Sequence, residues 1–479
     1  MTDARWQSPL GSRYASPEMQ RLWGEPHRIG LWRRLWLALA EAEQELGLPI
    51  PDAALAEMRS HLDDCDLAVA AAFEKRFRHD VMAHVHAFGD QAPAARPFLH
   101  LGATSAFVTD NADLVVMRDG LRLLLGRLVG ALDQLAEFAE AHATLPCLAY
   151  THFQPAQLTT VGKRATLWMQ DLALDVEELL RRIETLRFRG CQGTTGTQAS
   201  FLQLFEGDHA KVRELERRVA AKVGFTNSFA VTGQTYPRKL DSMILDALSG
   251  VAQSAAKMAT DLRLLQHEGE LLEPFESEQI GSSAMAYKRN PMRAERIGAL
   301  ARFVISLQSN GAHTAATQWL ERTLDDSANR RLVLPEAFLA TDAILLLVAN
   351  IAGGLEVREP VIARHVADQM PFMATERWLM LGTAAGGDRQ SLHEVVRVHS
   401  LAVAESVSRG EPNTLLEQLA AAPEFAGVPA DTLRAELDPA RYTGRAPEQV
   451  GEFLDEFLTP LLARARTVMS TAPAGEIRV

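Results

Sequence analysis

Apolar residues recur at spacings of three and four along several long segments, and no other feature of the sequence limits the possible folds as strongly. Three segments, 121–139, 172–186 and 240–265, show the pattern most clearly. Spacings of three and four place apolar side chains on one face of a helix. Two more long helices are expected at 291–318 and 330–352. Because stripes of this length let helices pack side by side at shallow angles, the sequence predicts a central bundle of five long helices.

The remainder of the chain has shorter and less regular helical patterns. No strand-like alternation of any length is present, and aromatic residues make up only 6% of the chain, which favours helix over sheet. We therefore expect an all-α fold with three helical domains. They are an N-terminal helical domain at 1–104, the central long-helix bundle at 105–357 and a C-terminal helical domain at 358–479.

Charge, cysteines and apolar runs exclude several classes of protein. The formal net charge of -12 argues against general nucleic-acid binding, because phosphate contacts need clustered Lys and Arg. The 3 cysteines are scattered and form no CxxC pair, which favours a reducing compartment. The N-terminal stretch has no apolar segment that could act as a signal peptide, and the longest apolar run, 343–355, is too short to span a bilayer. We expect a soluble cytoplasmic protein with no nucleic-acid or membrane partner.

Three motifs resemble ligand sites but lack the required spacing. The histidines of RHDVMAHVH, residues 78–86, do not fall three or four positions apart, so they do not share a helix face as zinc ligands would. VGKRAT, residues 161–166, has Arg164 where a phosphate-binding loop needs Ser or Thr. The serines that follow Gly281 lack the GxSxG pattern of serine hydrolases. No metal site is therefore expected.

The connections between the long helices hold most of the polar residues. In GSSAMAYKRNP, residues 281–291, small residues and hydroxyl groups precede Lys288, Arg289 and Asn290, and Pro291 is a residue favoured at a helix start. A small polar loop that leads into a helix is typical of a mobile lid over an anion. A solvated turn is the alternative.

A second polar connection, ERTLDDSANRR at 321–331, brings Arg322, Ser327 and Arg331 close together. Two guanidinium groups and a hydroxyl suit a phosphate, because guanidinium groups match its oxygens in pairs. The alternative is a helix-capping turn with weak surface ion pairs. The residues themselves do not decide between the two.

Taken together, these connections resemble one family. GSSAMAYKRNPMRAER is similar to the signature loop of the fumarase/aspartase superfamily, whose pattern is roughly GSSxMPxKxNP. Within that superfamily the chain resembles the adenylosuccinate lyases, particularly their animal-type form, through SPLGSRYASPEM, RHDVMAHVH, HLGATS, THFQPAQLTTVGKR, RGCQGTTGTQASF, TGQTYPRK and QWLERTLDDSANRR. The resemblance runs from residue 8 to RYTGRAPEQV near the C-terminus. One departure is Ala286, which stands where the family usually has proline.

The resemblance implies a fold, an assembly and a reaction. The fold would be three helical domains, with the central bundles of four subunits packed into a homotetramer and active sites shared between subunits. The reaction would be β-elimination of fumarate from adenylosuccinate, giving AMP, and from succinylaminoimidazole carboxamide ribotide, giving aminoimidazole carboxamide ribotide, in purine nucleotide biosynthesis. The partners would be these small succinylated purine nucleotides, and no metal or organic cofactor is implied.

Such an elimination needs a base, an acid and fixed positive charge. The resemblance assigns the base to Ser282 and the acid to His152, and places Lys288 and Asn290 on the succinyl carboxylate where charge develops. It implies that His79 supports the acid or binds the substrate. Further substrate-binding residues implied by the motifs are Arg13, Tyr14, Arg78, Asp80, Thr104, Ser105, Thr151, Gln234, Arg296, Arg322, Ser327 and Arg331.

Two other interpretations stay open. A paralogous lyase that acts on another succinylated nucleotide or nucleoside in a specialised pathway would use the same chemistry with a different base pocket, and Ala286 leaves room for it. A non-catalytic protein that kept the fold is the second. Loss of Ser282, His152 or Lys288 would indicate such a protein, and all three residues are present.

Overall fold

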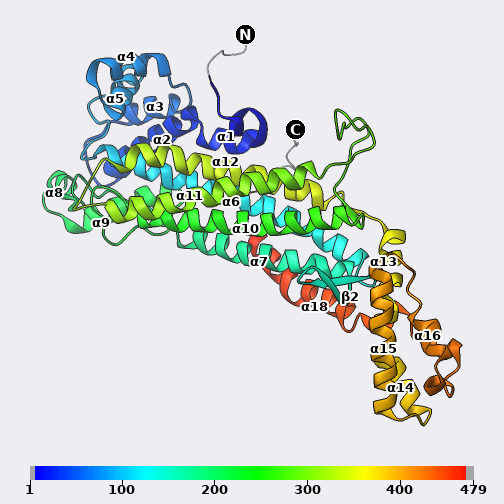
Figure 1. The fold of residues 1–479 in the computed structure, drawn as a ribbon. Helices are drawn as coiled ribbons and strands as arrows, with labels where there is room; N and C mark the ends of the chain where they lie inside the picture. The colour runs from blue at the N-terminus through cyan, green and yellow to red at the C-terminus, as the bar shows by residue number, and fades with distance from the viewer. Residues whose placement is uncertain (1–5, 471–479) are drawn as a thin grey trace.

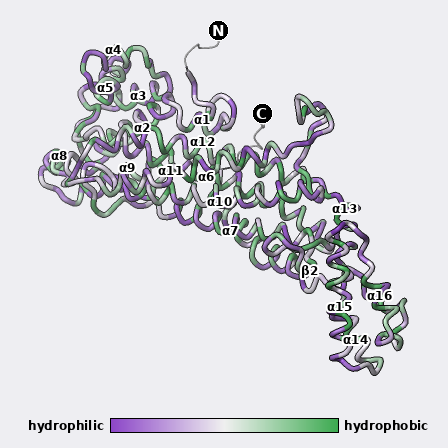
Figure 2. Tube along the Cα trace, viewed as in Figure 1, coloured by the Kyte–Doolittle hydropathy of each residue, from purple (hydrophilic) through white to green (hydrophobic). Residues whose placement is uncertain are grey.

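Five long helices form the body of the protein. The computed structural model describes residues 6–470. The five helices lie side by side along the long axis of the molecule (Figure 1), and they are α6 (Ser105–Ala141), α7 (Val161–Thr185), α10 (Lys239–His267), α11 (Met292–Thr317) and α12 (Asp326–Ala352). Their apolar stripes are buried, and hydrophobic and hydrophilic positions alternate along each helix (Figure 2). The predicted all-α fold with a central five-helix bundle is confirmed.

Most of the apolar run at 343–355 lies in α12, which ends at Ala352. By length and composition α12 could cross a membrane, but 72% of its most apolar window is buried inside the protein. Ile344, Leu345 and Val348 are fully buried against the other long helices. The run is therefore the core of the bundle.

Smaller helices pack against the end of the bundle at which α6 begins. Figure 1 shows the first helices in blue above one end, with two later helices beside them. These helices are η1 (Leu10–Tyr14), α1 (Pro17–Trp23), α2 (Glu25–Glu45), α3 (Asp52–Ser60), α4 (Leu67–Phe77), α5 (Asp80–Gln91), α8 (Ala199–Leu204) and α9 (His209–Lys222). They share one continuous apolar core with the long helices.

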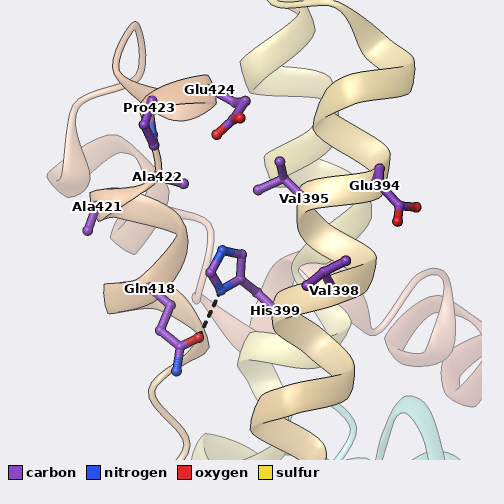
Figure 3. A pocket seen from close by; sticks show the side chains of 9 residues that line it. All are labelled: Glu394, Val395, Val398, His399, Gln418, Ala421, Ala422, Pro423 and Glu424. Carbon is purple, nitrogen blue, oxygen red and sulfur yellow. Dashed lines mark hydrogen bonds between the residues drawn. The ribbon is translucent and has the colours of Figure 1, made fainter.

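A second apolar core lies at the opposite end. It contains Trp378, Leu392, Leu419 and Phe425, and a groove of about 570 Å³ separates two of its helices, where His399 Nδ1 lies 2.9 Å from Gln418 Oε1 (Figure 3). The elements after the bundle are α13 (Glu359–Met373), α14 (Thr375–Ala384), α15 (Arg389–Ser408), α16 (Leu415–Ala421), η2 (Pro423–Phe425), α17 (Ala430–Ala435), η3 (Pro439–Tyr442), α18 (Ala446–Glu452), η4 (Phe453–Leu458) and α19 (Thr459–Arg466). The chain then returns to the bundle, because α18 packs on α7, and α19 packs on α6 and α7.

The division into three domains stays a prediction. The helix α6 begins at Ser105, beside the predicted boundary at 104, and the predicted boundary at 357 falls at the end of a short strand. The outer ends of the predicted first and third domains, 1–5 and 471–479, lie outside the described residues.

Two small antiparallel sheets accompany the helices, although the sequence shows no strand-like alternation. In the first, β1 (Pro146–Thr151) pairs with β2 (Gln154–Thr160), and in the second, β3 (Leu271–Leu272) pairs with β4 (Glu356–Val357). The first four residues of β2 are exposed, so no apolar alternation marks it in the sequence. Strands of two residues are too short to show any period. The sequence pattern did not reveal these segments because pairing here does not depend on an apolar face.

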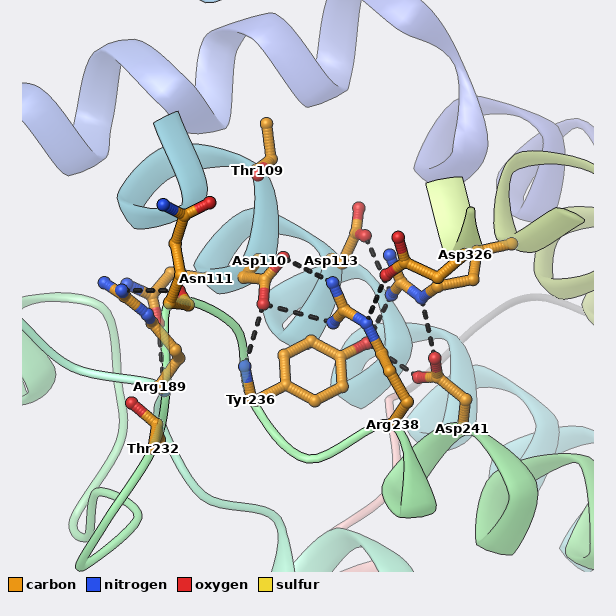
Figure 4. A network of polar contacts seen from close by, with 12 residues as sticks. Thr109, Asp110, Asn111, Asp113, Arg189, Thr232, Tyr236, Arg238, Asp241 and Asp326 are labelled. Carbon is orange, nitrogen blue, oxygen red and sulfur yellow. Dashed lines mark hydrogen bonds and ion pairs between the residues drawn. The ribbon is translucent and has the colours of Figure 1, made fainter. Parts of the chain in front are cut away.

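A buried ionic network joins three of the long helices (Figure 4). Arg238, immediately before α10, forms two hydrogen bonds of 3.1 Å with the carboxylate of Asp110 in α6. Its Nε also donates to Asp326 at the start of α12, at 2.6 Å. The three side chains are at most 4% exposed. Although burial opposes ionisation of Asp110, the guanidinium groups of Arg238 and Arg330 hold its pKa below the usual value.

Arg330 of α12 completes the network from the other side. Its Nε donates to Asp241 of α10 at 2.6 Å, and its Nη2 lies 3.1 Å from Asp113 of α6. It also donates to the hydroxyl oxygen of Tyr236, which in turn donates to Asp241 at 2.7 Å. The Tyr236 ring lies 4.5 Å from one guanidinium group, that of Arg238, and 5.4 Å from the other. Each buried charge therefore has an opposite charge and a hydrogen-bond partner, which offsets its desolvation.

The adjacent arginines 330 and 331 provide a test of this network. We expect Arg330→Met to lower the free energy of unfolding by about 3–5 kcal/mol, because the carboxylate of Asp241 loses its buried cation. The matched variant is Arg331→Met, since Arg331 is 58% exposed and pairs with Asp80 at the surface. Arg331→Met should lower the free energy of unfolding by less than about 1 kcal/mol. Urea unfolding of both variants measures the difference, and equal losses would contradict the assigned importance of the network.

Glu43 of α2 is a buried carboxyl group without a partner. It is fully buried, and neither of its oxygens has a hydrogen-bond partner. Burial raises its pKa to about 9, so the group is protonated near neutral pH. Its folded-state pKa lies above the ordinary value of 4.5. The folded state therefore binds a proton that the unfolded chain releases, and stability falls as the pH rises between these two values.

We expect Glu43→Gln to remove this dependence. Between pH 6 and 8 the free energy of unfolding of the unchanged protein should fall by about 1.4 kcal/mol per pH unit more than that of the variant. Urea unfolding at three pH values in this range measures both slopes. The control is Glu45→Gln, on the same helix, where the carboxylate pairs at the surface with Lys222 and its pKa is lowered. The prediction fails if Glu43→Gln and Glu45→Gln show the same slope.

Candidate active site

The segment 281–290 forms an exposed loop between β3 and α11, and it extends away from the bundle at the upper right of Figure 1. Within it the hydroxyl oxygen of Ser282 accepts hydrogen bonds from the backbone N–H groups of Ala284, at 3.3 Å, and Met285, at 3.1 Å. Backbone N–H groups aimed at one oxygen stabilise negative charge on it. The loop therefore holds the predicted base in an arrangement that suits an alkoxide, with Lys288 exposed on the same loop.

Short contacts hold the two ends of this loop together. Asn290 Nδ2 donates to the carbonyl oxygen of Gly281 at 2.7 Å. A Cβ at position 281 would lie 2.1 Å from the carbonyl oxygen of Lys288, so only glycine permits this close approach. Arg289 forms hydrogen bonds of 2.7 and 3.2 Å with Glu356 of β4. In this arrangement Asn290 is engaged with the loop, whereas the sequence predicts that it contacts the succinyl carboxylate.

His152 lies in the turn between β1 and β2. His152 and Phe153 form the turn with φ values of 54° and 58°, in the left-handed region that favours glycine. Non-glycine residues are held there at a cost, and such positions cluster at functional sites. Both side chains are exposed, and Thr151 at the end of β1 is exposed beside them. The predicted acid is thus presented at the tip of a hairpin.

Several predicted site residues lie close together at the N-terminal end of α6. His79 caps α5, where its Nδ1 accepts the backbone N–H of Met82 at 3.3 Å, so a neutral ring carries its proton on Nε2. That Nε2 lies 3.5 Å from the hydroxyl of Ser105, the first residue of α6. Asp80 accepts a hydrogen bond of 3.1 Å from Arg331. The structure therefore brings His79, Asp80, Ser105 and Arg331 together.

Two more predicted site residues, Arg296 and Arg322, each contact another side chain. The guanidinium group of Arg296 in α11 lies 5.7 Å from the ring of Tyr14. Arg322 donates to Asp326 at 3.0 Å, so it forms an ion pair as the capping-turn alternative describes, but with a buried carboxylate. The other predicted residues lie in η1 (Arg13), at the end of α4 (Arg78), immediately before α6 (Thr104) and in the first turn of α12 (Ser327).

Arg189 contacts two of the polar connections between the helices, and the sequence interpretation missed it. It is buried, and its guanidinium group donates to the carbonyl oxygens of Gly193, at 2.8 Å, and Gln234, at 2.5 Å. The side chain of Gln234 donates to the carbonyl oxygen of Thr194 at 3.0 Å. These bonds hold the connections GTTGTQ and TGQTYPRK side by side. The available signal was an arginine directly before a glycine-rich connection, which could equally have been a surface residue.

One chain does not bring all the predicted residues together. The His79 group lies at the end of the bundle next to α5, and the hairpin with His152 lies toward the opposite end, next to α13 (Figure 1). The grooves between α15 and α16 and between β1 and α13 contain no predicted site residue. Within residues 6–470, no group of three or more His, Cys, Asp or Glu side chains could hold a metal ion, and all three cysteines are free.

Solved structures share the fold at low identity. The chain matches the crystal structure of a 3-carboxy-cis,cis-muconate lactonizing enzyme from Pseudomonas putida with a TM-score of 0.79 and 23% identity, over 95% of this chain and 98% of that one. A fumarate lyase from Mesorhizobium sp. matches with a TM-score of 0.76 and 23% identity, over 94% and 98% of the two chains. At this identity the likeness concerns the fold alone.

Sequence comparison is more specific. A family model described as lyase matches residues 31–306, and one described as adenylosuccinate lyase C-terminus matches residues 371–453. The adenylosuccinate lyase of Schizosaccharomyces pombe is 48% identical over 97% of both chains. That of Saccharomyces cerevisiae is 50% identical over 94% of both, and that of Schistosoma mansoni is 49% identical over 95% of this chain and 96% of its own. With identity this high along nearly the whole length, the chain belongs to the adenylosuccinate lyase family of the fumarase/aspartase superfamily.

Proposed function

We propose that this protein is a carbon–nitrogen lyase that removes fumarate by β-elimination from adenylosuccinate, giving AMP, and from succinylaminoimidazole carboxamide ribotide, giving aminoimidazole carboxamide ribotide. The relatives named adenylosuccinate lyase, at 48–50% identity over nearly the full chain, support the reaction class. The observation that carries the mechanism is the hydroxyl oxygen of Ser282, which faces two backbone N–H groups in the exposed loop.

The first step removes a proton from the carbon next to a carboxylate. A serine hydroxyl is too weak a base for this unless its alkoxide is stabilised. The backbone N–H groups of Ala284 and Met285 and the positive charge of Lys288 supply such stabilisation in our proposal. Lys288 and Asn290 would also hold the succinyl carboxylate, on which negative charge develops. Asn290 would then exchange its contact with Gly281 for the substrate.

The second step breaks the carbon–nitrogen bond, and the leaving nitrogen takes up a proton. His152 is the proposed acid, because imidazole can donate a proton near neutral pH and the hairpin exposes it at its tip. His79 would bind the substrate or support the acid, with its Nε2 proton directed at Ser105.

The nucleotide needs a local positive region although the chain is acidic. In our proposal the phosphate and ribose contact Arg13, Tyr14, Arg296, Arg322, Ser327 and Arg331, and the succinyl part contacts Thr104, Ser105, Thr151 and Gln234. Arg78 and Asp80 flank His79 in the same region. Guanidinium groups match phosphate oxygens in pairs, so a few arginines suffice and the net charge of -12 is no obstacle.

We further propose a cytoplasmic homotetramer with active sites shared between subunits. Complete sites would then combine the hairpin of one subunit with the His79 group of another. Large apolar side chains on the outer faces of the long helices support a contact there, since Leu167 and Leu174 of α7 are 52% and 53% exposed and Ile305 of α11 is 37% exposed. Three free cysteines fit a reducing compartment.

The reaction is tested by following the ultraviolet absorbance change as adenylosuccinate is converted to AMP and fumarate. We expect Ser282→Ala and His152→Ala to lower kcat by about 10²–10⁴-fold, because each removes a proton-transfer group. The matched control is Ser283→Ala, in the neighbouring hydroxyl, which should keep most of the activity. A folded unchanged protein that leaves adenylosuccinate intact would contradict the assignment and favour another succinylated nucleotide.

Sharing of sites is tested by mixing the two inactive variants. Subunits of Ser282→Ala and His152→Ala are dissociated together and reassembled in equal amounts. If base and acid come from different subunits, about a quarter of the sites receive both intact residues and activity returns to about that fraction. Each variant reassembled alone should stay inactive. No recovery in a reassembled mixed oligomer would show that one subunit supplies both groups.

A further inference from the structure

The hairpin that carries His152 has few contacts of its own to fix its position. The first four residues of β2 are exposed, and the turn at His152 and Phe153 lies in the left-handed region. The strand pairing is also irregular, because the register shifts between Leu148 and Tyr150. A two-stranded hairpin of this kind is marginal in water, and a β-bulge loosens its ladder further. The position of the turn must therefore be set from outside the hairpin.

Besides the packing of the hairpin against α13, Arg164 of α7 makes a direct polar contact with it from outside. Its Nη2 donates to the carbonyl oxygen of Leu148, at the point where the strand register shifts. Its guanidinium group lies 6.0 Å from the ring of Tyr150, and that ring lies 5.7 Å from the ring of Phe153 in the turn. The Arg164 side chain is only 11% exposed. One cation on a rigid helix thus contacts the hairpin four residues before His152 and again two residues before it.

The carboxylate of Glu270 lies behind Arg164. Glu270 is fully buried, and its Oε2 lies 3.8 Å from Arg164 Nη1, an ion pair without a hydrogen bond. Its Oε1 lies 3.0 Å from Nδ1 of His365 in α13. Its carbonyl oxygen accepts the backbone N–H of Arg358 at 2.9 Å. Glu270 is therefore held by α13 and by the segment before it, and Arg164 is held between Glu270 and the hairpin.

Glu270 also lies directly before the strand that leads into the loop with Ser282. The next residues, Leu271 and Leu272, form β3. Glu273 then accepts the backbone N–H groups of Arg293 and Ala294, both at 3.0 Å, at the start of α11. The strand and this cap fix the base of the loop. The contacts that hold the hairpin and those that hold the loop therefore meet at one buried residue, Glu270.

We propose that Arg164, held in place by Glu270, is a positioning residue that sets the orientation of the His152 hairpin for proton donation. The role of His152 as acid rests on the function proposed above, whereas the anchoring of the hairpin does not. Arg164 directs one donor to β1, which ends at Thr151 directly before the turn at His152, so its loss displaces the acid and leaves the substrate-binding residues of the other elements in place.

The kinetic test compares Arg164→Gln with Arg181→Gln. Arg181 lies on the same helix, is 55% exposed and pairs with Glu178 at the surface. We expect Arg164→Gln to lower kcat by about 10–100-fold, the effect of a small misplacement of a reacting group, with KM changed less than about threefold. Arg164→Lys, which keeps the charge, should recover part of the loss, and Arg181→Gln should match the unchanged protein. A higher KM at unchanged kcat would overturn the proposal.

The second measurement is independent of turnover. Amide hydrogen exchange is followed in the full oligomer for residues 146–160, with α6 as the internal reference. In Arg164→Gln the hairpin amides should exchange about tenfold faster than in Arg181→Gln, and the α6 amides at the same rate in both. Equal hairpin exchange in the two variants would overturn the proposal. Should the unchanged protein fail to turn over adenylosuccinate, the proposed function falls while the exchange still decides whether Arg164 anchors the hairpin.

Discussion

The pairing of buried arginines with buried aspartates where α6, α10 and α12 meet is the constraint on which the rest of the structure depends. Burying an ion is costly unless its partners are in place, so these charges tolerate few relative positions of the three helices. Asp110 receives two bonds from Arg238, and the same guanidinium group reaches Asp326. Since Asp326 also accepts from Arg322, the network extends directly into the connection that precedes α12. Apolar stripes alone would allow the helices to slide by a turn, whereas these pairs fix their register.

The network also shows how a buried residue can hold a helix in place while the next residue in the sequence is exposed. Arg330 is buried in the network, while Arg331, the next residue, points to the surface and pairs with Asp80. A helix rotates by about 100° per residue, so one arginine can anchor the helix while its neighbour faces a ligand. The connection TGQTYPRK follows the same division, since Tyr236 is buried in the network and Gln234 lies at its edge. At these two positions a buried residue therefore fixes the place of a nearby residue that is less buried.

The sequence predicted the parts of this design that depend on apolar burial. The stripes at 121–139 and 240–265 identified α6 and α10, because a buried helix face leaves a period of three and four in the chain. The hairpin at 146–160 was not predicted, since its exposed strand leaves no such period. The network was missed for a related reason. A charged residue such as Arg238 has the same appearance in a sequence whether it lies at the surface, binds a ligand or pairs with a buried aspartate.

The candidate residues came from a resemblance, and their geometry sets a condition on the assembly. In a β-elimination the proton and the leaving nitrogen sit on adjacent carbons, so the acid and the residues proposed to bind the substrate must contact a single small molecule. One chain holds its acid on a hairpin near α13 and its His79 group beyond the other end of α6, a helix of 37 residues, or about 55 Å. No bending of a bundle locked by buried ion pairs closes that separation. If His152 and the His79 group serve one site, as we propose, the bundles must pack antiparallel, because such packing brings the end of one chain beside the opposite end of another.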